Sequence, residues 1–91
     1  MANSLSEVFA TNVRLRMAQL GLKTSDLYRR SGISKTTIMA LCSGKSKGVQ
    51  FSTIARLAKA LYCQPEHFFS ASTHWVAFKW ANDYRKEDEH D

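Results

Sequence analysis

Cysteine and long apolar runs are both scarce in this 91-residue sequence. Its two cysteines, Cys42 and Cys63, allow at most one disulfide, and each falls where an apolar side chain is expected, so we expect reduced, buried thiols. No run approaches the roughly 18 apolar residues that a membrane span needs. The opening MANSLSEVFATN lacks the pattern of an export signal. We therefore expect a cytoplasmic protein without a membrane partner.

Motifs of catalysis and metal binding are also missing. His67, His74 and His90 are scattered over the last quarter of the chain, and with Cys63 they do not match the paired spacing of zinc sites. No glycine-rich phosphate loop follows a strand, and no serine or cysteine nucleophile has a recognisable base. We expect no catalytic residue, no metal, no cofactor and no small-molecule ligand, and an enzyme is not indicated.

Basic residues are present in excess, and they are unevenly distributed. The net charge is +5, but residues 1–81 carry +8 and residues 82–91 carry −3. Between residues 22 and 50 one acid, Asp26, stands among six lysines and arginines. Such a surface attracts a polyanion through Coulomb steering and counterion release. A merely solvated basic surface would have the same composition, so charge alone does not decide.

Apolar spacing predicts helices over most of the chain. Ser4 and Glu7 form a capping box before a helix that ends at Gly21. A second helix begins at residues 24–26 and ends near Gly32, and Ser34 caps a third over residues 35–42. A fourth is expected over residues 51–62, and Pro65 suits the first turn of a fifth. The inward positions are expected to be Leu5, Phe9, Val13, Met17 and Leu20 in the first helix and Phe51, Ile54, Leu57, Ala58 and Leu61 in the fourth.

The third helix has an unusual outward face. Ile38 and Leu41 share an inward face, whereas Lys35, Thr36, Met39, Ala40 and Ser43 fall on the other. Short side chains without a carboxylate suit a helix that enters the major groove of DNA. Lysine can donate to guanine, threonine can bond a base edge, and alanine permits close approach. A surface helix of unusual composition is the alternative.

In its order of helices the sequence resembles the compact helix-turn-helix domain of the lambdoid phage repressors and Cro proteins, the XRE type. The resemblance covers residues 9–69 and is carried by LGLKTSDL, SGISKTTIMALCSGK and STIARLAKALYCQPEHFF. It implies an all-α, compact five-helix, lambda-repressor-like domain over residues 1–69 that binds double-stranded DNA. It also implies that the third helix reads the sequence.

The resemblance implies roles for individual residues. Base reading falls to Lys35, Thr36 and Ala40, with Thr37 and Met39 beside them. Phosphate binding falls to Thr24, at a helix start that suits an anion, and to Lys45 and Lys47 in the basic loop. We further expect phosphate contacts from Ser25, Ser34 and Ser43.

Several positions depart from the family pattern. Tyr28 stands where alanine is usual, Tyr62 replaces a glycine, and Lys23 replaces a serine or threonine cap. Met17 and Cys42 replace an arginine and a glutamate that pair in many members. That joint change is interpreted as a buried ion pair exchanged for apolar packing.

Aromatic residues gather after the fourth helix, six of ten within residues 68–84. Residues 70–84 are expected to form a dimerisation extension, as a strand in which Val76, Phe78 and Trp80 alternate or as a helix to about Tyr84; the strand is favoured. The expected homodimer interface is Phe69, Trp75, Val76, Phe78 and Trp80. Alternatively, these rings fold back as a sixth core element. Residues 85–91 are expected to form a flexible acidic tail.

Two functions are compatible with these patterns. The first is a sequence-specific transcriptional regulator, a phage or prophage type of repressor that binds a palindromic operator as a homodimer. Its third helices would enter successive major grooves. The second is an antitoxin-like interaction protein, in which the C-terminal aromatic segment binds a partner protein.

Overall fold

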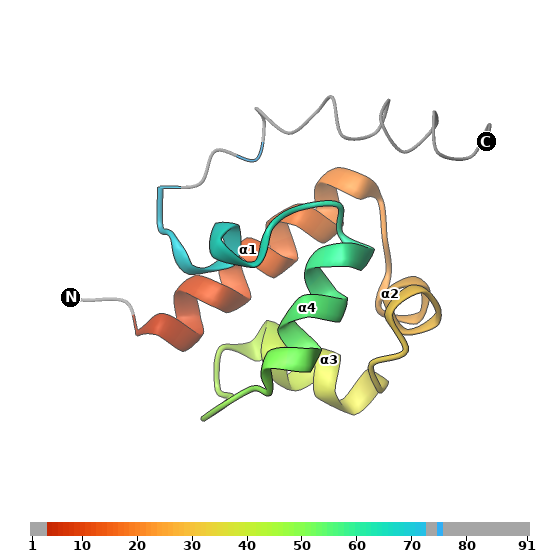
Figure 1. Cartoon of the computed structure of the whole chain (residues 1–91), viewed down its shortest axis with the longest axis horizontal. Coiled ribbons are helices and arrows are strands. Elements are labelled where there is room, and N and C mark those ends of the chain that lie inside the picture. Colours follow the sequence, from red (N-terminus) through yellow and green to blue (C-terminus); the bar gives the residue numbers. More distant parts are fainter. Residues whose placement is uncertain (1–3, 73–74, 76–91) are drawn as a thin grey trace.

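The computed structural model describes residues 4–72 and Trp75, which form a small helical fold (Figure 1). The helices are α1 (Leu5–Leu20), α2 (Thr24–Ser31), α3 (Lys35–Ser43) and α4 (Phe51–Ala60), followed by the 3₁₀ helix η1 (Pro65–Phe69). No strand occurs in the described part. The all-α class is thereby confirmed, although the fifth helix is a short 3₁₀ helix instead of an α-helix.

Local side-chain chemistry sets the starts of these helices. At α1, the Ser4 hydroxyl accepts from the Glu7 amide at 3.2 Å, and the Glu7 carboxylate accepts from the Ser4 amide at 3.0 Å, as the capping box predicts. At α3, the Ser34 hydroxyl accepts from the Thr37 amide at 3.2 Å. Gly32, with φ of 75°, makes the left-handed turn that lets α3 follow α2 directly.

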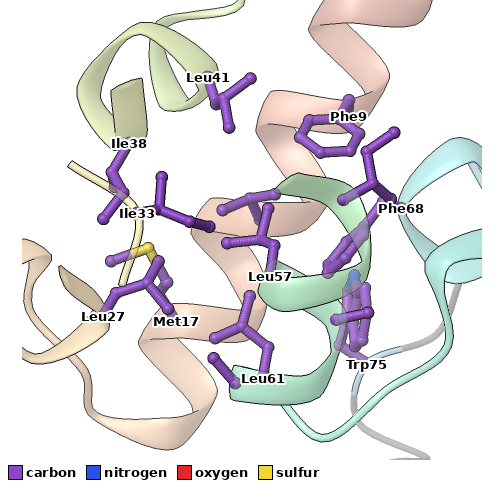
Figure 2. Close-up of a cluster of buried hydrophobic side chains, with 14 residues drawn as sticks. Phe9, Met17, Leu27, Ile33, Ile38, Leu41, Leu57, Leu61, Phe68 and Trp75 are labelled. Carbon is purple, nitrogen blue, oxygen red and sulfur yellow. The ribbon is translucent and has the colours of Figure 1, made fainter. Parts of the chain in front are cut away.

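The core draws on every helix, and Figure 2 shows its side chains converging between α1, α3 and α4. Phe9 packs against Phe68 with ring centroids 5.3 Å apart. Two expected core residues are wrong: Leu5 is 61% exposed and Phe51 is 89% exposed. Each is the first residue of its helix. The apolar spacing continues to that residue, but the elements that bury the rest of the face do not cover it.

Trp75 belongs to this same core and is 6% exposed (Figure 2). Its indole nitrogen donates to the Asn12 side chain at 2.9 Å, and its carbonyl accepts from the Gln19 amide. The ring is already covered by α1 and η1, which favours the alternative that it folds back as a core element, and a role of Trp75 in a dimer interface stays a prediction. Val76, Phe78 and Trp80 lie outside the described residues, as do the strand-or-helix question and the acidic tail.

Arg16 is fully buried at 0% exposure, which apolar periodicity does not predict. Its Nε donates to the Leu61 carbonyl at 2.7 Å, and its other nitrogens reach the Tyr62 carbonyl and the Gln19 side chain. Its guanidinium carbon lies 5.5 Å from the Trp75 ring centroid. Burial lowers the pKa of Arg16 from its ordinary value. The guanidinium thus ties α1 to the end of α4.

The positions that depart from the family pattern are accommodated in different ways. The Cys42 and Met17 sulfurs are 4.0 Å apart, so the two residues do meet across α1 and α3. Both cysteines are free, as expected, although they are half-buried instead of fully buried. Tyr28 is 45% exposed, so its ring leans outward. Tyr62 has a φ of 54°, the left-handed conformation that the more usual glycine adopts without strain.

Among the described residues no helix is long and apolar enough to cross a membrane.

Candidate nucleic-acid interface

Helix α3 is held against the rest of the fold by two residues on one face. Ile38 is 1% exposed and Leu41 is 4% exposed, and both point into the core in Figure 2. Because that face is buried, the opposite face must meet solvent. Lys35, Thr36, Met39, Ala40 and Ser43 are all exposed, as the helical wheel predicts. Figure 1 shows α3 at one edge of the fold, next to the loop that leads to α4.

Lys35 stands at the start of this exposed face. Its ammonium lies 5.5 Å from the ring centroid of Tyr28, which projects from α2. A cation over an aromatic face is stabilised where water competes only partly. The unusual tyrosine therefore does not disturb the packing of α2 on α3; it supports the lysine that begins the outward face. Sequence reasoning left the direction of this ring open.

Three hydroxyls of the expected site already have partners within the protein. Ser34 donates to the Thr37 hydroxyl at 2.9 Å while accepting from the Thr37 amide. Ser43 donates to the Ala40 carbonyl at 2.7 Å and accepts from the Lys45 amide at 3.2 Å. Thr37 is half-buried, in contrast to the exposed Thr36. These hydroxyls fix the two ends of α3, and Thr36 has the more accessible side chain for an external ligand.

The loop after α3 carries Lys45 and Lys47, and both are exposed. The loop is fastened to α1, because the Ser6 hydroxyl donates to the Ser46 carbonyl at 2.8 Å. A second bond within the loop joins the Ser46 hydroxyl to the Gly48 carbonyl at 2.8 Å. The two lysines thus project from an anchored turn beside α3.

Sequence reasoning missed a shallow hollow between α3 and the start of α4. Its walls include Thr36 and Ala40 from α3 and Gln50 and Thr53 from the α4 side. Gln50 immediately precedes α4 and is exposed. An exposed amide at a helix start is a signal that could have found it, since asparagine and glutamine read base edges as well as phosphates.

The start of α2 is less favourable to an anion than expected. Thr24 and Ser25 are half-buried there. The Asp26 carboxylate already accepts from the Lys23 amide at 2.9 Å and pairs with Arg29 at 2.7 Å. The Lys23 amide, followed by Arg29 and Lys23 charges, lowers the pKa of Asp26. A phosphate at Thr24 and Ser25 would approach this carboxylate, and their phosphate role stays a prediction.

The electrostatics of the α3 surface suit a polyanion. The described acids are Glu7, Asp26 and Glu66, and none of them lies on α3 or on the loop that follows it. Glu7 of α1 lines a hollow together with Ser43 and Gly44 at the end of α3. Within the described residues no group of three histidines, cysteines or acids could hold a metal ion. The arrangement offers donors and close approach, which are the requirements of groove recognition.

Comparison with known proteins also indicates a helix-turn-helix protein that binds DNA. A family model described as the Cro/C1-type HTH DNA-binding domain matches residues 12–73. The HTH-type transcriptional regulator YozG of Bacillus subtilis (strain 168), itself uncharacterized, is 33% identical over 54 residues. That match covers 59% of this chain and 64% of the relative, so it spans less than two thirds of the relative's length. No solved structure matches.

Proposed function

The chain belongs to the Cro/C1-type helix-turn-helix DNA-binding family, and on that premise we propose that it is a transcriptional regulator that binds double-stranded DNA in a sequence-specific manner. Helix α3 enters the major groove and reads base edges through Lys35, Thr36, Met39 and Ala40. Thr37 assists by ordering the start of that helix. Lys45 and Lys47 neutralise phosphates beside the groove.

One observation supports this proposal above the others: α3 buries Ile38 and Leu41 and leaves a carboxylate-free face of short side chains exposed. A surface helix without a ligand has no need to exclude acids. A helix in the major groove does, because a carboxylate there meets phosphates and mostly acceptor atoms on the bases. The loop after α3 adds Lys45 and Lys47, the cations that contact with the DNA phosphate backbone requires.

The proposal extends to a homodimer on a palindromic operator, in the manner of phage or prophage repressors. A single α3 contacts only a few base pairs, and two copies related by a twofold axis double the sequence that is read. Phe69 is 36% exposed, and its ring centroid lies 5.2 Å from that of Phe9. It is one surface residue that a second copy could cover. Half-sites would then lie about 34 Å apart, one turn of DNA.

Selection from a random duplex pool tests this function. The full chain is incubated with the pool at about 0.15 M salt, and bound duplexes are sequenced over several rounds. We expect an enriched palindrome whose half-sites are separated by one helical turn, bound on the order of 10³-fold more tightly than a shuffled duplex. Sedimentation of the complex gives its stoichiometry.

Three results would count against parts of the proposal. If no motif is enriched, the proposal of sequence-specific binding is wrong. If the enriched motif is not repeated and one copy of the protein binds it, the proposal of a homodimer is wrong. Equal affinity of wild type and a Lys35→Ala/Thr36→Ala variant for the selected duplex would remove α3 as the reading helix.

A further inference from the structure

A second basic surface lies away from α3, in a hollow between the ends of α2 and α4. Its lining residues are Arg30, Ser31, Arg56, Lys59, Ala60 and Tyr62. We call it the basic hollow. Three of its six lining residues are cations, and the lining contains no acid. The guanidinium carbon of Arg30 lies 4.8 Å from the Tyr62 ring centroid, so the aromatic ring forms part of the same wall.

The cations of the basic hollow have no acidic partner among the described residues. The ion pair in that part of the chain joins Arg29, which precedes Arg30 in the last turn of α2, to Asp26 in the first turn. Like charges that share one hollow repel each other, and an anion placed among them is attracted by all of them. The proposed base-reading and phosphate-binding residues do not line this hollow, so the duplex contacts proposed above leave it unused.

The last described residue, Trp75, is connected to the basic hollow through the side chain of Arg16. Arg16 lies 5.5 Å from the Trp75 ring centroid and donates to the Tyr62 carbonyl at 3.0 Å, so one buried side chain touches both residues. Tyr62 is part of the hollow, and Trp75 is the last residue described. Arg16 therefore connects the last described residue to a residue that lines the basic hollow.

The most acidic stretch of the sequence lies in this last part of the chain. Residues 87–91 read EDEHD, with four acids and no lysine or arginine. Glu87 lies twelve positions after Trp75, and an extended chain of that length spans at most about 40 Å. This length is enough for the acidic stretch to reach a hollow whose residue Tyr62 is connected to Trp75 through one side chain, Arg16.

We propose that residues 87–91 bind in the basic hollow of the same molecule. Their carboxylates pair with Arg30, Arg56 and Lys59. Individual exposed ion pairs are weak, but a short tether gives the segment an effective concentration on the order of millimolar at the hollow. The contact therefore forms without high affinity, and salt weakens it. It shields part of the positive surface when no DNA is present.

NMR spectroscopy of the full chain without DNA, at low salt, tests the contact. The wild type is compared with the variant Glu87→Gln/Asp88→Asn/Glu89→Gln/Asp91→Asn, which has the same length but no acid in this stretch. We expect the side-chain Nε–Hε signals of Arg30 and Arg56 and the Tyr62 amide to shift between the two proteins. The differences should vanish at about 0.5 M salt, where the Debye length is below about 5 Å. Unchanged signals would overturn the proposal.

The location is tested in a second background. Arg56→Gln/Lys59→Gln removes two cations of the basic hollow, and Arg29→Gln is the matched control because Arg29 is an exposed cation of α2 outside the hollow. Neutralising residues 87–91 should shift the Arg30 and Tyr62 signals in the control but at most a third as much in the Arg56→Gln/Lys59→Gln protein. Equal shifts in both, or shifts confined to α3 and its loop, would overturn the assignment to this hollow. Since no duplex is present, the outcome is independent of the proposed DNA-binding function.

Discussion

The indole Nε1 of Trp75 donates to the Oδ1 of Asn12 at 2.9 Å, joining two residues 63 positions apart in the sequence. The same Asn12 side chain donates from Nδ2 to the carbonyls of Phe68 and Ser70, at 2.8 and 3.0 Å. One amide on α1 therefore satisfies a buried indole and two backbone carbonyls. It fixes the segment after η1 against the core.

Asn12→Ala should destabilise the fold by about 2–3 kcal/mol, because it leaves buried donors and acceptors without partners. Urea unfolding measures the loss. In a Trp80→Phe background, the emission of Trp75 should also shift to the red as water reaches the indole. Thr11→Ala is the control, since Thr11 is exposed and should change stability by less than about 0.5 kcal/mol. Equal stabilities of the two variants would contradict the role of Asn12.

Helix positions and the inward face of α3 could be predicted from sequence because local rules determine them. Capping residues and glycines mark helix ends, and the spacing of Ile38 and Leu41 fixes which face of α3 is buried. The exposed face that is proposed to read DNA is set by the same spacing. The residue assignments on that face depended on the family resemblance in addition, and their contacts with DNA stay predictions.

The polar interior of α1 could not be predicted in the same way. Asn12 and Arg16 occupy inward positions, but their partners are carbonyls 45 to 58 residues away. A period of apolar residues gives no information on where a distant helix ends and exposes its carbonyls. Phe51 fails for the opposite reason, since its position in the period is inward but no described element covers it.

Lysines of the loop and residues of α3 should differ in their effect on DNA binding. Lys45→Ala or Lys47→Ala should weaken binding to selected and random duplexes alike and lower the slope of log K against log salt by about one each. Lys35→Ala or Thr36→Ala should cost about 1–3 kcal/mol on the selected duplex and far less on random DNA. Fluorescence anisotropy at several salt concentrations measures both.

Arg29→Ala is the control for the loss of a positive charge alone, because Arg29 pairs with Asp26 and lies outside the proposed interface. Its salt slope should stay close to that of the wild type. If all five variants lose the same affinity on both kinds of DNA, the division between phosphate-binding and base-reading residues is wrong.

Tyr62 should tolerate glycine better than alanine. Both substitutions remove the ring and its contact with Arg30, so they differ only in the backbone. At a φ of 54° a Cβ is unfavourable, and Tyr62→Gly should be more stable than Tyr62→Ala by about 1 kcal/mol. At Ala55, an exposed position inside α4, the order should reverse, with Ala55→Gly costing about 1 kcal/mol. Thermal and urea unfolding give both differences, and a preference for alanine at residue 62 would contradict the strained backbone.

Cys63 should make the fold sensitive to alkaline pH. Burial raises the pKa of the Cys63 thiol to about 12, and the nearby Arg16 charge offsets only part of that shift. In the unfolded chain the thiol titrates near its ordinary pKa of 9.0, so above this pH the unfolded state loses a proton that the folded state keeps. The stabilising difference is complete below pH 9 and is lost as the pH rises toward 12.

The measurement compares urea unfolding of the wild type and Cys63→Ala from about pH 8 to about pH 10.5, a range that begins below the thiol's ordinary pKa. The two proteins differ only at residue 63, so the difference between their two curves isolates the thiol. We expect the wild type to lose stability more steeply above about pH 9, and its folded form to react slowly with thiol reagents at about pH 8, because the thiolate is the reactive species. Parallel curves would mean that Cys63 ionises as easily in the folded protein as in the unfolded chain. They would contradict the raised pKa that is attributed to its burial.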